Sequence, residues 1–220
     1  MAVGARILLA GVALAGASCA GGATSVTPEQ SVVVLASTGC RPTTNAALGA
    51  VVAEELVATV AHAVAGEDEI IVRQDGAELR GVVVAIDTAL DAALLRVEGL
   101  DAEPIERRDY AVGDDASLLV DEEGEIVSTA IDVERRVTIR TSDIYRDGEH
   151  ARPALDLVAD VRGGDSGAPL VGDDGRLLAL VWATSRQTDD RAWALPIEAF
   201  DPLLEAAESG APPPQVECSR

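Results

Sequence analysis

The chain has 220 residues, 48% of them hydrophobic, and a formal net charge of −21 at pH 7. A mature chain of about 200 residues can bury a sizeable core as one globular unit. The strong negative charge argues against nucleic acid or an anionic membrane surface as a direct electrostatic partner. All 17 basic residues are arginine, which we interpret as compositional bias. We interpret the many acidic residues as part of a solvated surface.

The first 23 residues predict an export signal. Arg6 precedes a short apolar stretch at residues 7–17, which is shorter than the roughly 20 residues of a membrane span and fits a signal peptide. Residues 14–19 read Leu-Ala-Gly-Ala-Ser-Cys, which resembles a lipoprotein box except for Gly16, where an aliphatic residue is usual. We expect residues 1–23 to be a signal peptide and Cys19 to be lipidated, with plain secretion as the alternative.

Residues 24–220 predict an all-β protein, because short apolar segments alternate with turn residues at the spacing of a sandwich or barrel. The first set of expected strands covers residues 31–37, 49–54, 56–60, 69–73, 77–86 and 92–97. A polar linker with Pro104 follows at about residues 101–113. The second set covers residues 116–120, 125–132, 136–141, 154–158, 177–184 and 192–197, and residues 198–208 have helical spacing.

The motif Gly-Asp-Ser-Gly at residues 164–167 is unusual for a structural loop. Glycines allow backbone conformations that other residues avoid, and such conformations can direct consecutive amide N–H groups into one concavity. A concavity of this kind can bind the oxyanion of an acyl-transfer reaction. Ser166 is therefore a candidate nucleophile, and an ordinary glycine-rich turn is the alternative.

A serine nucleophile needs a base and an acid that orients the base. The chain has two histidines. His62 ends an apolar strand, where an imidazole can be held in one orientation, whereas His150 lies in a charged loop and is expected to be solvated. Asp91 has apolar neighbours on both sides, and a buried carboxylate needs a partner such as His62. Asp87 is the rival acid, although its neighbour Thr88 indicates a turn.

The order His62, Asp91, Ser166 excludes two classes of serine hydrolase. The α/β-hydrolase order places histidine last, and no histidine follows Ser166. The subtilisin order needs an aspartate before its histidine, and no aspartate precedes His62. The chymotrypsin order remains.

These segments resemble the trypsin-like serine proteases. Residues 59–63, Thr-Val-Ala-His-Ala, resemble the family's Thr-Ala-Ala-His segment, and residues 87–95 resemble its Asp-Leu-Ala-Leu-Leu segment. Residues 164–170, Gly-Asp-Ser-Gly-Ala-Pro-Leu, resemble Gly-Asp-Ser-Gly-Gly-Pro-Leu. Residues 161–166 and 192–197 resemble bacterial extracytoplasmic members, including the HtrA-like group and the membrane-anchored actinobacterial acid-resistance protease. The resemblance covers roughly residues 31–200.

The resemblance implies two packed six-stranded antiparallel β-barrels, at about residues 31–100 and 114–200, with the active site between them and a short helix and tail at residues 198–220. It implies a serine endopeptidase in which Ser166 attacks the peptide carbonyl, His62 transfers the proton and Asp91 holds the imidazole. The N–H groups of Gly164 and Ser166 would bind the oxyanion. We expect no metal or cofactor, a protein or peptide substrate, and a monomer.

The three cysteines favour export. If Cys19 carries lipid, Cys40 and Cys218 remain as a pair. A disulfide between them would clamp the C-terminal tail to the first barrel, as in some extracytoplasmic relatives, and closing so long a loop stabilises by about 4–5 kcal/mol in the chain-entropy model. Because such bonds persist outside the cytoplasm, we expect a secreted protein or a lipoprotein at the cell surface.

The resemblance gives conflicting signals about the substrate pocket. Asp160 lies six residues before Ser166, where family members selective for Arg or Lys carry an acid. Trp182, Ala183 and Ala192 would line the pocket walls, and the two alanines stand where open-pocket members have glycine. Their methyl groups would narrow the pocket, so we expect preference for a small or medium apolar side chain.

Two further features concern activation. The chain lacks the Ile-Val-Gly-Gly run with which trypsin-like enzymes begin after zymogen cleavage, so we expect that Asp165 does not await a new N-terminal amine. Ala168 replaces the second glycine of the usual motif and adds a methyl group close to the nucleophile. The alternative functions are a catalytically silent trypsin-like fold that serves as a surface binding module, and an esterase on the same fold.

Overall fold

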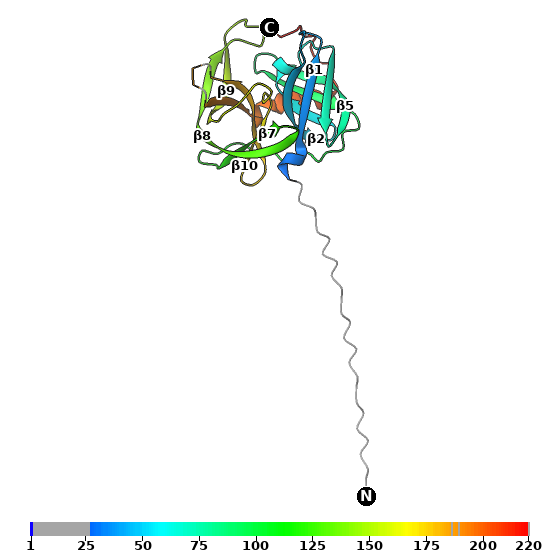
Figure 1. Ribbon diagram of the computed structural model, residues 1–220, viewed down its shortest axis with the longest axis vertical. Coiled ribbons are helices and arrows are strands. Elements are labelled where there is room, and N and C mark those ends of the chain that lie inside the picture. The colour runs from blue at the N-terminus through cyan, green and yellow to red at the C-terminus, as the bar shows by residue number, and fades with distance from the viewer. Residues whose placement is uncertain (2–26, 186, 189, 220) are drawn as a thin grey trace.

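The computed structural model describes residues 1, 27–185, 187–188 and 190–219. The expected signal peptide after Met1, with the lipidation candidate Cys19, lies outside the described residues. In the described part of the chain, no helix is long and apolar enough to cross a bilayer. Two β-barrels lie side by side, and both termini of the described fold lie at its periphery (Figure 1).

The first barrel is a closed antiparallel sheet with the strand order β1-β2-β3-β6-β5-β4. Pairing between β1 and β4 closes it. Its strands are β1 (Val32–Thr38), β2 (Asn45–Ala53), β3 (Leu56–Thr59), β4 (Glu69–Gln74), β5 (Ala77–Asp87) and β6 (Ala92–Val97).

The second barrel is a closed antiparallel sheet with the strand order β10-β11-β12-β9-β8-β7. Pairing between β7 and β10 closes it. Its strands are β7 (Ala116–Glu122), β8 (Glu125–Thr141), β9 (His150–Val158), β10 (Pro169–Gly172), β11 (Leu177–Thr184) and β12 (Arg191–Pro196). The chain ends with 3₁₀ turn η3 (Ile197–Phe200), helix α1 (Asp201–Ser209) and a tail.

The apolar runs of the sequence form two packed cores. One cluster fills the first barrel and includes Val33, Leu35 and Val57. The other fills the second barrel and continues across the interface to Leu48 and Leu94 of the first. Strand β2 therefore buries residues on both faces, because one face lines its own barrel and the other packs against the second barrel.

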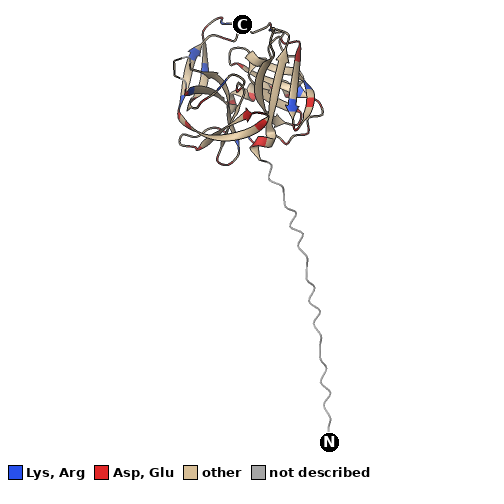
Figure 2. Ribbon diagram, in the orientation of Figure 1, with Lys and Arg blue, Asp and Glu red and all other residues tan. Residues whose placement is uncertain are grey.

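The predicted all-β fold with two six-stranded barrels and a short C-terminal helix is confirmed. Two strand assignments were wrong. Residues 125–132 and 136–141 form one strand, β8, with a register irregularity between Val133 and Arg135. Strand β10 was not predicted, because it has only four residues directly after the serine motif. Acidic positions are spread over both barrels (Figure 2), in keeping with the net charge of −21.

Candidate active site

His62 lies between the two other predicted triad residues. It belongs to 3₁₀ turn η2 (Ala61–Ala63), which follows the buried strand β3. Its Nδ1 lies 2.8 Å from Oδ2 of Asp91, and its Nε2 lies 3.1 Å from Oγ of Ser166. Its backbone N–H also donates to Oδ1 of Asp91, at 2.8 Å. The structure thus brings all three side chains into one hydrogen-bonded chain.

Asp91 lies in the tight turn between β5 and β6 and is 5% exposed. Its φ of +61° is left-handed, a conformation that aspartate adopts more readily than most residues. The rival acid, Asp87, has a different place. Its Oδ1 accepts hydrogen bonds from the backbone N–H groups of Ala89 and Leu90, at 2.9 and 2.8 Å. Asp87 therefore caps the turn that presents Asp91.

Ser166 is held between the two barrels. Its carbonyl accepts a hydrogen bond from the N–H of Leu48 in β2, at 2.7 Å, and the next residue, Gly167, donates to Val181 of β11, at 2.7 Å. Gly167 has a φ of +84°, and a Cβ there would lie 2.0 Å from the carbonyl oxygen of Leu48. The close approach of β2 thus requires glycine directly after the serine.

The segment before Ser166 forms a hydrogen-bonded turn. The N–H of Asp165 donates to the carbonyl of Arg162 at 3.1 Å, and the N–H of Arg162 donates to Oδ2 of Asp165 at 2.7 Å. Gly164 has a φ of +108° at the third position, where a type II turn requires a positive value. Burial raises the pKa of the Asp165 carboxyl, and the hydrogen bond from Arg162 opposes that effect. The N–H groups of Gly164 and Ser166 have no acceptor among the described residues.

No side-chain hydrogen bond in the described part of the chain joins the predicted pocket residues to one another. The Asp160 side chain is 70% exposed and pairs with Arg162 at 3.1 Å. Ala192 is buried on β12, where it pairs with Leu157 of β9 and Thr184 of β11. Trp182 and Ala183 are partly buried at the end of β11. His150, the less favoured histidine, begins β9 and pairs with Thr141 of β8.

Sequence reasoning missed Arg152 of β9, which is 2% exposed. Its Nε and Nη2 donate to the carbonyl of Ala89, at 3.1 and 2.6 Å. Its Nη1 lies 3.8 Å from Oδ2 of Asp91. Its guanidinium stacks over the ring of Trp182, 4.2 Å from the centroid. One arginine before a proline gave no signal of burial in the sequence.

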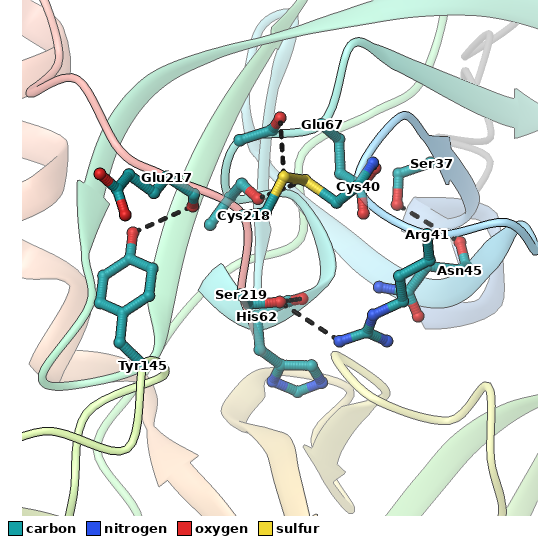
Figure 3. The surroundings of a disulfide bond; sticks show 12 residues. Ser37, Cys40, Arg41, Asn45, His62, Glu67, Tyr145, Glu217, Cys218 and Ser219 are labelled. Atoms are coloured by element: carbon teal, nitrogen blue, oxygen red, sulfur yellow. Dashed lines mark hydrogen bonds between the residues drawn. A yellow bond between two sulfur atoms is a disulfide. The ribbon is translucent and has the colours of Figure 1, made fainter.

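The C-terminal tail passes beside His62 at Ser219. Cys218 forms the predicted disulfide with Cys40, with 5.4 Å between the Cα atoms. The next residue, Ser219, donates its hydroxyl to the carbonyl of His62 at 2.8 Å and accepts from Arg41 at 3.3 Å. Figure 3 shows the tail passing the disulfide and reaching His62. Among the residues that the structure describes, no group of three His, Cys, Asp or Glu side chains could hold a metal ion.

Known proteins share both sequence and fold with this chain. Residues 47–180 match the model of the trypsin-like peptidase domain. The chain is 28% identical over 170 residues to the serine protease Rv3671c of Mycobacterium tuberculosis strain H37Rv, a match that covers 76% of this chain and 42% of that protein. The chain therefore spans about two fifths of the length of that curated relative.

Solved structures share the fold of this chain. The crystal structure of the Rv3671c protease from M. tuberculosis in its active form matches with a TM-score of 0.81 and 26% identity, covering 88% of this chain and 87% of that one. The inactive form matches with a TM-score of 0.70 and 26% identity, covering 81% and 89%. An HtrA-type protease with a bound tripeptide matches with a TM-score of 0.69, covering 81% and 60%, and at 19% identity it shows the fold alone.

Proposed function

The chain belongs to the trypsin-like peptidase family, and we propose that it is an exported serine endopeptidase with a His62–Asp91–Ser166 triad. The observation that carries the proposal is the continuous contact from Asp91 through His62 to Ser166, with distances of 2.8 and 3.1 Å. Such an arrangement of nucleophile, base and orienting acid activates a serine for acyl transfer.

The proposed mechanism follows from the contacts among the three side chains. Ser166 Oγ attacks the peptide carbonyl while Nε2 of His62 accepts its proton, and the imidazolium then gives this proton to the leaving amine. The carboxylate of Asp91 accepts a hydrogen bond from Nδ1–H, so it selects the tautomer with a free Nε2 and stabilises the imidazolium. A water molecule then attacks the acyl-enzyme while His62 accepts its proton. His62 returns this proton to Ser166 Oγ, which releases the carboxylic acid product.

The oxyanion of the tetrahedral intermediate would be bound by the N–H groups of Gly164 and Ser166. The positive φ of Gly164 and the turn from Arg162 to Asp165 support this assignment. Preorganised N–H donors stabilise developing negative charge strongly, because no reorganisation is needed during the reaction. The reaction needs no metal or cofactor.

The substrate is proposed to be a protein or peptide with a small or medium apolar side chain before the scissile bond. This preference rests on the alanines at positions 183 and 192, which stand where open-pocket members of the family have glycine, and Ala192 itself is fully buried on β12. The exposed ion pair between Asp160 and Arg162 speaks against selection of a basic side chain by Asp160. We further propose that the protein acts as a monomer outside the cytoplasm, either secreted or anchored through Cys19. The Cys40–Cys218 disulfide supports the location, because it fits an oxidising compartment.

Labelling of the purified protein with a fluorophosphonate probe tests the proposal. We expect covalent labelling of the wild type, none of Ser166→Ala, and strong suppression in His62→Ala. A folded wild-type protein that stays unlabelled at high probe concentration would overturn the enzyme assignment in favour of the silent binding module. Comparison of matched peptide and ester substrates then separates a peptidase from an esterase.

A further inference from the structure

Arg152 is the one buried arginine among the described residues, and it reaches from the second barrel into the turn that carries Asp91. Taking a guanidinium out of water is costly unless nearby groups compensate. Burial lowers the pKa of Arg152, an effect opposed by the negative charges of Asp91, Asp87 and Asp143. An arginine side chain nonetheless stays protonated in a protein, so a fixed positive charge lies beside the triad acid.

The contacts of Arg152 converge on one turn. Two of its nitrogens donate to the carbonyl of Ala89, and a third lies 3.8 Å from the carboxylate of Asp91. From the other side, the carboxylate of Asp87 accepts the N–H groups of Ala89 and Leu90. The carbonyl and N–H sides of the turn are therefore fixed by different side chains.

Such fixation matters because the backbone of Asp91 is left-handed, with a φ of +61°. A residue other than glycine keeps this conformation only when its surroundings determine it. The same residue must direct both carboxylate oxygens at His62. A small rotation of the turn would break one or both of these hydrogen bonds.

Arg152 also connects the two barrels. His62 and Asp91 belong to the first barrel, whereas Ser166 belongs to the segment before β10 of the second. Arg152 is in β9, also of the second barrel, and its guanidinium is stacked on Trp182 of β11. It therefore ties the acid of one barrel to the barrel that carries the nucleophile.

We propose that Arg152 is a positioning residue of the triad, which fixes the Ala89–Asp91 turn and so holds Asp91 against His62. The inference rests on the proposed function. Because Arg152 is 2% exposed, it does not touch the substrate, and its loss lowers kcat at unchanged KM. The expected loss in Arg152→Met is about 100-fold, the scale at which a displacement of about 1 Å affects a catalytic group.

Arg191→Met is the matched control. Arg191 also lies over a tryptophan, 5.9 Å from the ring centroid of Trp193, but its ion-pair partner is Asp156 and not Asp91. Both substitutions remove a cation from an aromatic face of the second barrel. We expect Arg191→Met to lower the thermal midpoint and to leave kcat within about twofold, whereas Arg152→Met lowers kcat. Equal losses of kcat in both variants would overturn the proposal.

Proton NMR of the imidazole N–H of His62 provides a readout that does not depend on activity. The resonance is assigned by its loss in His62→Ala, and we expect it in the wild type and Arg191→Met but broadened by exchange in Arg152→Met. If Arg152→Met does not fold, Arg152→Lys keeps the charge with a single donor group and is expected to lose about tenfold in kcat.

Unchanged kcat and an unchanged His62 resonance in a folded Arg152 variant would overturn the positioning role. Failure of the proposed function looks different, because the wild type itself would then resist the fluorophosphonate probe. In that case the His62 resonance still shows whether Arg152 holds Asp91 against the imidazole.

Discussion

The carboxylate of Asp91 binds His62 twice, since Oδ2 lies 2.8 Å from the ring Nδ1 and Oδ1 lies 2.8 Å from the backbone nitrogen. One contact fixes the ring and the other fixes the turn that carries it. One side chain from the neighbouring strand connection therefore holds both the imidazole and the backbone of His62.

Replacing that carboxylate gives the first prediction. We expect Asp91→Asn to lower kcat about 10⁴-fold, because an amide can stabilise the wrong imidazole tautomer and carries no charge to balance the imidazolium. Steady-state hydrolysis of a peptide substrate measures the effect. Asp87→Asn is the matched control, since its side-chain oxygen can still accept from Ala89 and Leu90. A comparable loss in Asp87→Asn would contradict the assignment of Asp91.

Gly167 gives the second prediction. Alanine there would place its Cβ 2.0 Å from the carbonyl oxygen of Leu48 at a φ of +84°, so we expect the serine segment to be displaced and the free energy of unfolding to fall by about 3 kcal/mol. Denaturant titration and probe labelling report both effects. Gly163→Ala is the control, because a Cβ at Gly163 has no heavy atom within 4 Å. Wild-type stability of Gly167→Ala would refute the prediction.

The disulfide gives the third prediction. It closes a loop with a sequence separation of 178 residues, so in the chain-entropy model its reduction lowers the free energy of unfolding by about 5 kcal/mol. Urea unfolding with and without reductant measures the difference. The double variant Cys40→Ala/Cys218→Ala should match the reduced wild type and ignore the reductant. Equal stability of the oxidised and reduced proteins would show that the disulfide contributes nothing to the free energy of unfolding.

Asp156 gives a prediction about pH. Hydrogen bonds from Arg191 first, and then from Arg135, hold the pKa of its buried carboxyl below the usual value. Its ionised form therefore stabilises the native state above the unfolded-state pKa of about 3.9, and this contribution is lost as the pH falls through the lower native value.

We accordingly expect Asp156→Asn to lower the free energy of unfolding by about 3 kcal/mol near neutral pH, with a difference that shrinks below about pH 4. Thermal unfolding of both proteins from neutral to acidic pH is the measurement. A difference that stays constant over the whole range would exclude the ionised carboxylate as its source.

The substrate pocket gives the last prediction. Ala192 is buried on β12, and Ala192→Gly would remove the methyl group proposed to narrow the pocket. We expect kcat/KM for a substrate with a large apolar side chain to rise about tenfold relative to one with a small side chain, the scale of small changes in pocket volume. Peptide-library profiling of both proteins tests this. An identical profile in the two proteins would remove Ala192 from the pocket.

The residue pattern alone predicted an all-β protein and the candidates His62, Asp91 and Ser166, and the resemblance of its motifs to a known family implied the two barrels. Each strand either alternates apolar and polar residues or is apolar on both faces, so its pattern can be read from a short stretch of sequence. The motifs around the three residues are also continuous in the chain. Where local signals were weak, prediction failed. Strand β8 is mostly exposed and was divided, and β10 was missed because its four residues adjoin the serine motif.

The groups that surround the triad became known from the three-dimensional arrangement of the barrels. In the structure Asp87 caps the turn before Asp91, and Asp160 forms an exposed ion pair with Arg162. The fold also places Arg152 against Asp91 and Ser219 against His62, partners separated along the chain by 61 and 157 residues. The burial and the charge partners of a side chain depend on which strands the barrels bring together. The local sequence around Arg152 or Ser219 does not indicate those partners.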